Sequence, residues 1–120
     1  MPDAECVSVV VPVRNGTRTL PLCLPALLAQ DYPSERFELL CVDNGSTDDS
    51  VALMQRFSPR VQILRADTRG ASAARNEGIR RARHRWIAFT DCDCVPEPGW
   101  LSALMRFVRG YVGGRLFGPA

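Results

Sequence analysis

The sequence predicts an α/β fold with a mostly parallel sheet flanked by helices. Apolar runs rich in β-branched residues alternate with segments of helical spacing along the chain, an order typical of strands that are joined by helices. The first of these runs, Val7 to Val13, is rich in valine, which indicates a strand buried on both faces, as in parallel sheets. With 120 residues, the chain is long enough for one domain and too short for two.

Four strands are expected, each followed by a helix. The first strand covers the valine-rich run that ends at Val13, and the others are expected over residues 37–42, 61–64 and 86–90. Leucines at helical spacing predict a first helix between residues 20 and 28, although Pro25 would kink its interior. A fifth strand could begin at Tyr111 and Val112.

The remaining helices have recognisable starts. Ser46 followed by Asp49 resembles a capping box, which predicts a helix from there to Phe57 or Ser58. Gly70 precedes an alanine-rich helix over residues 71–83, and the last helix begins near Trp100. Because right-handed crossovers place the loops after parallel strands along one edge, the polar residues that end strands are the site candidates.

Composition excludes several functional classes. The 15 basic and 13 acidic residues leave a net charge of only +2, which argues against a nucleic-acid partner. Five cysteines without paired spacing predict buried, reduced thiols in a cytoplasmic protein. The N-terminus lacks the features of a signal peptide and the longest apolar stretch is too short for a membrane span. We therefore expect no transmembrane segment and a cytoplasmic protein, either free or at the inner face of the membrane.

Asp91 and Asp93 are the strongest site candidates. In an extended segment, residues i and i+2 point to the same side, roughly 6.6 Å apart along the strand. Both carboxylates would then face one ligand, with Cys92 and Cys94 directed toward the core. Carboxylate oxygens suit Mg²⁺ or Mn²⁺, which usually bridge to a substrate phosphate. A zinc site through the two cysteines is the alternative, and it lacks two further ligands.

Asp43 and Arg75 are weaker candidates when taken alone. Asp43 ends a buried strand, where its carboxylate could accept a hydrogen bond from the imide N–H of a base or from a ribose hydroxyl, or could serve an Asx turn. Arg75 lies one turn into a predicted helix, where a guanidinium suits a diphosphate. An exposed arginine without a ligand is the alternative.

Four segments together resemble the N-terminal half of a family 2 glycosyltransferase. They are VSVVVPVRNG, LLCVDNGSTDDS, RGASAARNEGI and WIAFTDCDCVPEPGWL, and they cover nearly the whole chain. The resemblance implies a Rossmann-like nucleotide-diphospho-sugar transferase fold of the GT-A type. It also implies that residues 1–120 are a single domain, truncated to the N-terminal part of a glycosyltransferase domain.

The same resemblance implies a nucleoside diphosphate sugar as ligand, with a UDP-sugar as the expected donor. Asp43 would contact the base, and Arg75 would lie near the ribose or diphosphate. Asp91 and Asp93 would form a DxD motif that holds the ribose and a divalent Mn²⁺ or Mg²⁺. The base and ribose pocket would be lined by Pro12, Val13 and Asn15.

The sequence also departs from the family pattern. Gly16 stands where many members have Glu, and Asn44 where a second Asp is common. The acceptor site and any general base are expected beyond Ala120, which leaves open whether the chain is an enzyme. We therefore expect transfer of a hexose to an unknown acceptor, or else a catalytically inactive nucleotide-binding module.

Two further expectations concern another enzyme class and self-association. A sugar nucleotidyltransferase has a similar fold but needs a glycine- and lysine-rich loop after the first strand. Residues 11–19 contain no lysine, so we set this function aside. If the sheet normally continues past Val112, an apolar edge would be left uncovered, which favours self-association.

Overall fold

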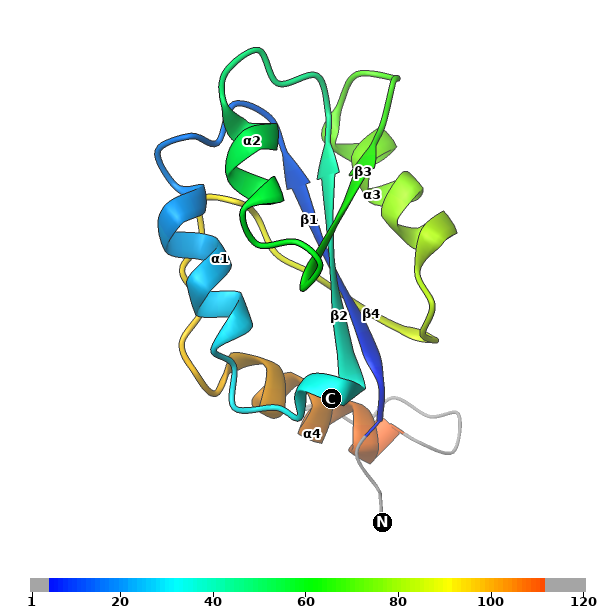
Figure 1. Cartoon of the computed structure of the whole chain (residues 1–120). Coiled ribbons are helices and arrows are strands. Elements are labelled where there is room, and N and C mark those ends of the chain that lie inside the picture. Colours follow the sequence, from blue (N-terminus) through cyan, green and yellow to red (C-terminus); the bar gives the residue numbers. More distant parts are fainter. Residues whose placement is uncertain (1–4, 112–120) are drawn as a thin grey trace.

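The sheet has four parallel strands whose carboxyl ends share one edge. The computed structural model describes residues 5–111 (Figure 1). The order across the sheet is β3-β2-β1-β4, and all neighbouring pairs are parallel. The strands are β1 (Val7–Val13), β2 (Phe37–Asp43), β3 (Val61–Arg65) and β4 (Trp86–Phe89). The predicted α/β fold is confirmed.

Helices cover both faces of this sheet (Figure 1). α1 and α2 lie on one face and α3 lies on the other, as expected when the chain runs from β1 outward to β3 and then returns across the sheet to β4. None of the described helices is long and apolar enough to cross a membrane. The helices are α1 (Leu20–Leu28), the short 3-10 helix η1 (Ser34–Arg36), α2 (Ser50–Gln55), α3 (Ala71–Arg81) and α4 (Trp100–Tyr111).

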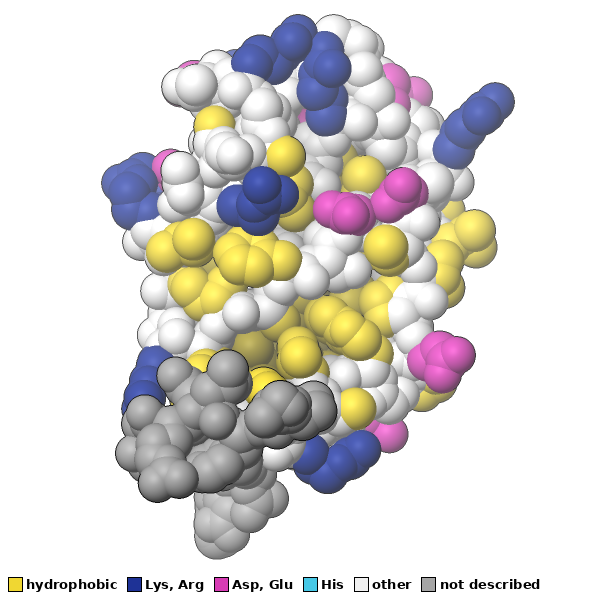
Figure 2. All heavy atoms as spheres, turned by 180° about the vertical axis from the view of Figure 1, so that it is seen from behind, with side chains coloured by type: hydrophobic (Ala, Val, Ile, Leu, Met, Phe, Trp, Pro, Cys, Tyr) yellow, Lys and Arg dark blue, Asp and Glu magenta, His cyan; other side chains and the backbone are white. Residues whose placement is uncertain are grey.

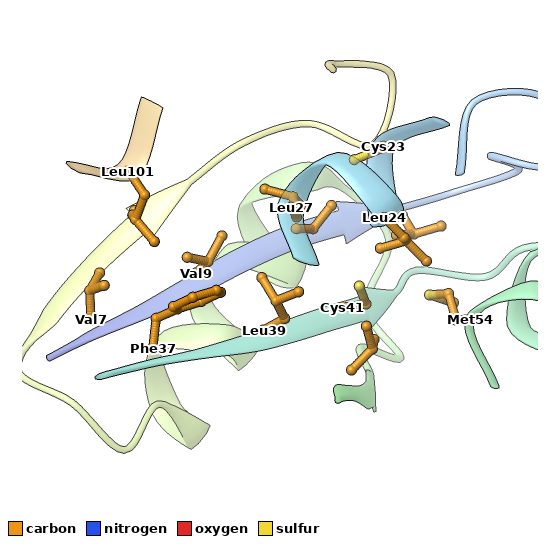
Figure 3. Packing of buried hydrophobic residues seen from close by; sticks show 14 of the residues in the cluster. Val7, Val9, Cys23, Leu24, Leu27, Phe37, Leu39, Cys41, Met54 and Leu101 are labelled. Atoms are coloured by element: carbon orange, nitrogen blue, oxygen red, sulfur yellow. The ribbon is translucent and has the colours of Figure 1, made fainter. Parts of the chain in front are cut away.

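The core surrounds β1 and β2 because both their faces are covered. Val9 and Val11 belong to the larger cluster, toward α1 and α2, whereas Val10 belongs to a smaller cluster beneath α3. This two-sided burial explains why β1 and β2 are mostly apolar and do not alternate between apolar and polar residues. The larger cluster also contains Leu24, Leu27, Leu39, Cys41, Met54 and Leu101 (Figure 3).

α3 approaches β1 closely at Gly78. A Cβ atom placed there would lie 2.4 Å from Cγ1 of Val10 and 2.9 Å from its Cγ2. Since the residue lies inside a helix, a glycine is required by this lack of space.

The helix predicted from Ser46 begins later, at Ser50, and ends at Gln55. The capping-box interpretation was wrong because the hydroxyl of Ser46 accepts a hydrogen bond from the backbone N–H of Asn15 (2.9 Å) instead of capping its own helix. Asp49 stands at the N-cap without a side-chain cap hydrogen bond. The residues between Ser46 and Ser50 are thus free to contact a neighbouring loop.

Two further expectations need correction. α1 continues through Pro25 to Leu28, and the side chain of Pro25 is exposed. Tyr111 is the last residue of α4 and does not begin a strand. Val112, the other residue of the expected fifth strand, lies outside the described residues.

The face that carries α3 is only partly covered. Seen from behind, hydrophobic side chains extend across the middle of the molecule (Figure 2). Phe89 of β4 lies beside Val10 in the sheet and is 41% exposed, and Ile79 of α3 is also exposed. Within residues 5–111, β4 pairs only with β1.

Candidate functional site

A cavity of about 730 Å³ lies at the carboxyl edge of the sheet and collects most of the predicted site residues. Its lining comes from the loops after β1 and β3, from Asn44 after β2, and from the segment after β4. We call it the larger cavity. Asp43 and Arg75 are outside its lining. The predicted residues that do line it are Pro12, Val13, Asn15, Asp91 and Asp93.

Asp91 and Asp93 converge because the chain turns between them. The backbone N–H of Cys94 donates to the carbonyl of Asp91 (3.1 Å), so the segment is a turn and not the extended strand that was predicted. Ligand atoms of Asp91, Asp93 and Cys94 lie within 4.8 Å of one another, and all three residues are exposed. Two carboxylates at this separation fit a divalent cation such as Mn²⁺ or Mg²⁺.

The cysteines of this segment lie differently from the prediction. Cys94 is exposed beside the two carboxylates, not directed to the core. Cys92 is half-buried, and burial raises the pKa of its thiol. Beneath it, Cys23 of α1 donates to the carbonyl of Asp91 (3.8 Å), and burial raises the pKa of Cys23 to about 12. The zinc alternative loses support, because Cys92 is separate from the group that includes Cys94.

Side-chain hydrogen bonds connect the loop after β1 to the loop after β2 and to the first residue of α2. Asn15 adopts a positive φ of 54°, and its Oδ1 accepts the N–H of Thr47 (2.8 Å). The N–H of Gly16 donates to the hydroxyl of Ser50 (2.7 Å). The carboxylate group of Asp48 accepts from Thr17 and from Ser50. These contacts set the shape of one wall of the larger cavity.

Asp48 is held in its charged form by this network. Hydrogen bonds from the Ser50 hydroxyl and then from Thr17 lower the pKa of Asp48 to about 2. Both loops therefore keep an ionised acceptor between them at any ordinary pH.

Asn44 fastens the third loop, between β3 and α3. Its Nδ2 donates to the carbonyls of Ala66 (3.2 Å) and Thr68 (2.8 Å), while its Oδ1 accepts the N–H of Gly70 (2.8 Å). The side chain is buried and uses both ends of its amide. Gly70 has a φ of 116°, a conformation that favours glycine, and begins the turn into α3.

Asp43 lines a separate hollow of about 440 Å³, the smaller cavity, formed with residues of α2 and β3. Its Oδ2 accepts a long hydrogen bond from the N–H of Ser46 (3.4 Å), so an Asx-type contact is present. Its Oδ1 is buried and has no hydrogen-bond partner among the described residues. A buried carboxylate oxygen without a donor is costly, so an N–H or O–H donor that reached it would offset this cost.

The comparisons with known proteins agree with this geometry. The sequence model of "Glycosyl transferase family 2" matches residues 8–113. The chain belongs to this family. Among relatives, it is 37% identical over 118 residues to Glycosyltransferase AglE of Haloferax volcanii, and 32% identical over 108 residues to the uncharacterized glycosyltransferase YibD of Escherichia coli. These alignments cover 92% and 88% of this chain but only 39% and 31% of the relatives.

Solved structures confirm the GT-A fold. TarS 1–349 of S. aureus, in complex with UDP-GlcNAc, matches 92% of this chain and 36% of that chain with a TM-score of 0.81 at 24% identity. The mannosyltransferase PcManGT of Pyrobaculum calidifontis, in complex with GDP-Man and Mn²⁺, matches 90% of this chain and 32% of that chain with a TM-score of 0.77 at 26% identity.

Both departures from the pattern of family 2 glycosyltransferases have a structural counterpart. A Cβ at Gly16 would lie 3.1 Å from Sγ of Cys92 and 3.3 Å from Cγ of Leu20, so the position has little room for a side chain. Asn44 donates to two carbonyls, which an aspartate could not do.

Sequence reasoning missed several residues of this cavity. Arg14, Arg18 and Arg69 line the larger cavity, as do Thr19 and Asn44. The positions of two arginines in the sequence could have identified them. Arg14 directly follows β1, and Arg69 directly precedes Gly70. Attention to the carboxylates that follow strands overlooked the arginines of the neighbouring loops.

Proposed function

We propose that this chain is the donor-binding part of a glycosyltransferase, which binds a nucleoside diphosphate sugar for transfer of a hexose to an acceptor. The main observation in support is that Asp91 and Asp93 converge in the cavity at the carboxyl edge of the sheet. Ligands of open α/β sheets bind at this edge. The relatives and solved structures that match are glycosyltransferases, which supports the same conclusion.

In this proposal, each cavity receives one part of the donor. The smaller cavity takes the base, because the free Oδ1 of Asp43 can accept the imide N–H of uracil. UDP-sugar is therefore the first donor to test, although guanine and thymine also offer a ring N–H. Arg75, half-buried on α3, is assigned to the ribose or diphosphate. The base and ribose pocket is lined by Pro12, Val13 and Asn15.

Asp91 and Asp93 would hold the divalent metal, Mn²⁺ or Mg²⁺, and Asp91 would also contact the ribose. The metal would supply positive charge that stabilises the nucleoside diphosphate as it leaves the sugar. The exposure of both carboxylates leaves them accessible to cation and ligand together. Mn²⁺ occurs in the solved mannosyltransferase, which supports testing it first.

Residues 1–120 are proposed to form a single domain, the N-terminal part of a family 2 glycosyltransferase domain. The family model covers residues 8–113, whereas the relatives are more than twice as long. An inactive nucleotide-binding module, which would bind the nucleotide without transferring a sugar, is the second candidate. Measured transfer of sugar to any acceptor would exclude it.

Calorimetric titration of UDP into the folded chain, with and without Mn²⁺, tests the proposal. We expect Mn²⁺ to strengthen UDP binding in the wild type but not in Asp93→Asn. Glu35→Gln is the matched control, because Glu35 is exposed on η1 and outside both cavities. No binding of UDP, GDP or dTDP by the folded wild-type chain would overturn the proposal.

Self-association through the free edge of β4 is a separate proposal. It rests on the unpaired edge within residues 5–111 and on the exposed Phe89. Sedimentation of the purified chain tests it, and a monomer at all concentrations would contradict it.

A further inference from the structure

We propose that Arg14, Arg18 and Arg69 form the anion-binding side of the larger cavity, hold the diphosphate of the donor, and sustain nucleotide binding in the absence of a metal. This inference rests on the proposed function and names the residues that contact the phosphates. It adds to the expectation that Arg75 lies near the ribose or diphosphate, since Arg75 is outside the lining of the larger cavity.

The first observation is the charge of the cavity. Three arginines line it together with two aspartates, so cationic side chains are in the majority before any metal binds. The view from behind shows arginine side chains along the top of the molecule, which is the carboxyl edge of the sheet (Figure 2). A hollow with this charge attracts a ligand that carries a negative charge on each phosphate.

The second observation is that these guanidinium groups have no ion-pair partner among the described side chains. Across residues 5–108, Arg14, Arg18 and Arg69 form no ion pair. Other arginines already have partners: Arg80 pairs with Glu77 (2.8 Å), and Arg85 lies over the ring of Trp86 (5.0 Å to the centroid). The arginines of the cavity thus keep their donors available for a phosphate, which guanidinium binds through paired N–H donors.

The third observation is where Arg69 lies. Its Nε is 3.5 Å from the position that a Cβ of Gly45 would occupy, and Gly45 lines the smaller cavity. Arg69 itself lines the larger cavity. The side chain therefore lies at the boundary between the two hollows. A nucleotide whose base reaches Asp43 would carry its diphosphate past this guanidinium.

The backbone beneath the arginines is fixed by the same network that shapes the cavity. Arg14 and Arg18 flank the segment in which Asn15, Gly16 and Thr17 bond to the loop after β2. The β3–α3 loop that carries Arg69 is held through Asn44. Only the exposed side chains need to be ordered on binding. The loss of conformational entropy is therefore limited to that of three arginine side chains.

The test measures UDP binding by calorimetry in the presence of EDTA. We expect the wild type to bind, each of Arg14→Gln, Arg18→Gln and Arg69→Gln to lose about tenfold in affinity, and the triple variant to lose measurable binding. Arg60→Gln is the matched control: Arg60 is exposed and precedes β3, at the opposite edge of the sheet. Inorganic pyrophosphate should compete with UDP in the wild type, and added salt should weaken both.

Each contrary result has a distinct meaning. Wild-type affinity in the triple variant would overturn the assignment of the arginines while leaving the proposed function in place. Binding that appears only with Mn²⁺ would overturn the metal-independent part. If the folded wild type bound no nucleoside diphosphate even with Mn²⁺, the proposed function itself would fail, and this inference with it. Circular dichroism confirms folding, which these exposed substitutions should preserve.

Discussion

Replacing Asn44 with alanine should destabilise the domain by about 3 kcal/mol, because the three hydrogen bonds of this buried side chain are lost. The side chain makes three hydrogen bonds, to the carbonyls of Ala66 and Thr68 and from the N–H of Gly70. Each such bond contributes about 1 kcal/mol net, and unpaired groups left in a buried site add to the cost. Because Asn44 is only 4% exposed, water cannot readily replace the lost partners.

Urea unfolding followed by circular dichroism measures the free energy of unfolding of this variant. Asn76→Ala is the control, since Asn76 is exposed on α3 and its loss should change stability by less than about 0.5 kcal/mol. Asn44→Asp extends the test: the carboxylate keeps the acceptor for Gly70 but faces two carbonyl oxygens, so it should be at least as destabilising near neutral pH. An Asn44→Ala variant as stable as the control would refute this account of the β3–α3 loop.

Three other predictions concern packing, pH and thiol reactivity. Gly78→Ala should cost about 1–2 kcal/mol of unfolding free energy, because overpacking against Val10 exceeds the gain in helix propensity; Val10→Ala in the same chain should restore part of it. Burial raises the pKa of Glu38, but hydrogen bonds from Ser8, Arg83 and Gln62 outweigh it and lower that pKa overall. Its contribution to stability is therefore complete above the unfolded pKa and is lost as pH falls through the folded one, so urea titrations of Glu38→Gln should show a weaker decline in acid. Iodoacetamide should label Cys94 in the native chain and spare Cys23, whose pKa is about 12, as peptide mass spectrometry would reveal.

The fold could be predicted because its strands are unambiguous. Val7–Val13 is apolar except for Ser8, and a run buried on both faces has few alternatives to a central parallel strand. Helix starts were harder to predict. Ser46 has the residue type of an N-cap, but its hydroxyl bonds to Asn15, 31 positions away, and a local pattern contains no information on such a partner.

Several residues of the candidate site were predicted from the sequence, but their arrangement in space was not. Asp91 and Asp93 were expected to share a side through strand alternation, whereas a turn brings their carboxylates together. The same turn exposes Cys94, which alternation had placed in the core. The division into two cavities could not be predicted either, because it depends on how α2 and β3 pack beside Asp43.

The two sides of the larger cavity have partly different anchors in the domain. The loops after β1, β2 and β3 are bonded to one another through Asn15 and Asn44. The segment after β4 contacts the loop after β1 through the Cys92 thiol. It is also held beyond the end of α1, where the buried Gln30 donates to the carbonyl of Glu97 (2.7 Å) and accepts the N–H of Leu101 (2.8 Å). Arginines are carried by the first set of loops and the carboxylates by the second. In the proposed function, a diphosphate bound between them is the group that contacts both sides, which is why nucleotide binding with and without metal can report on each side separately.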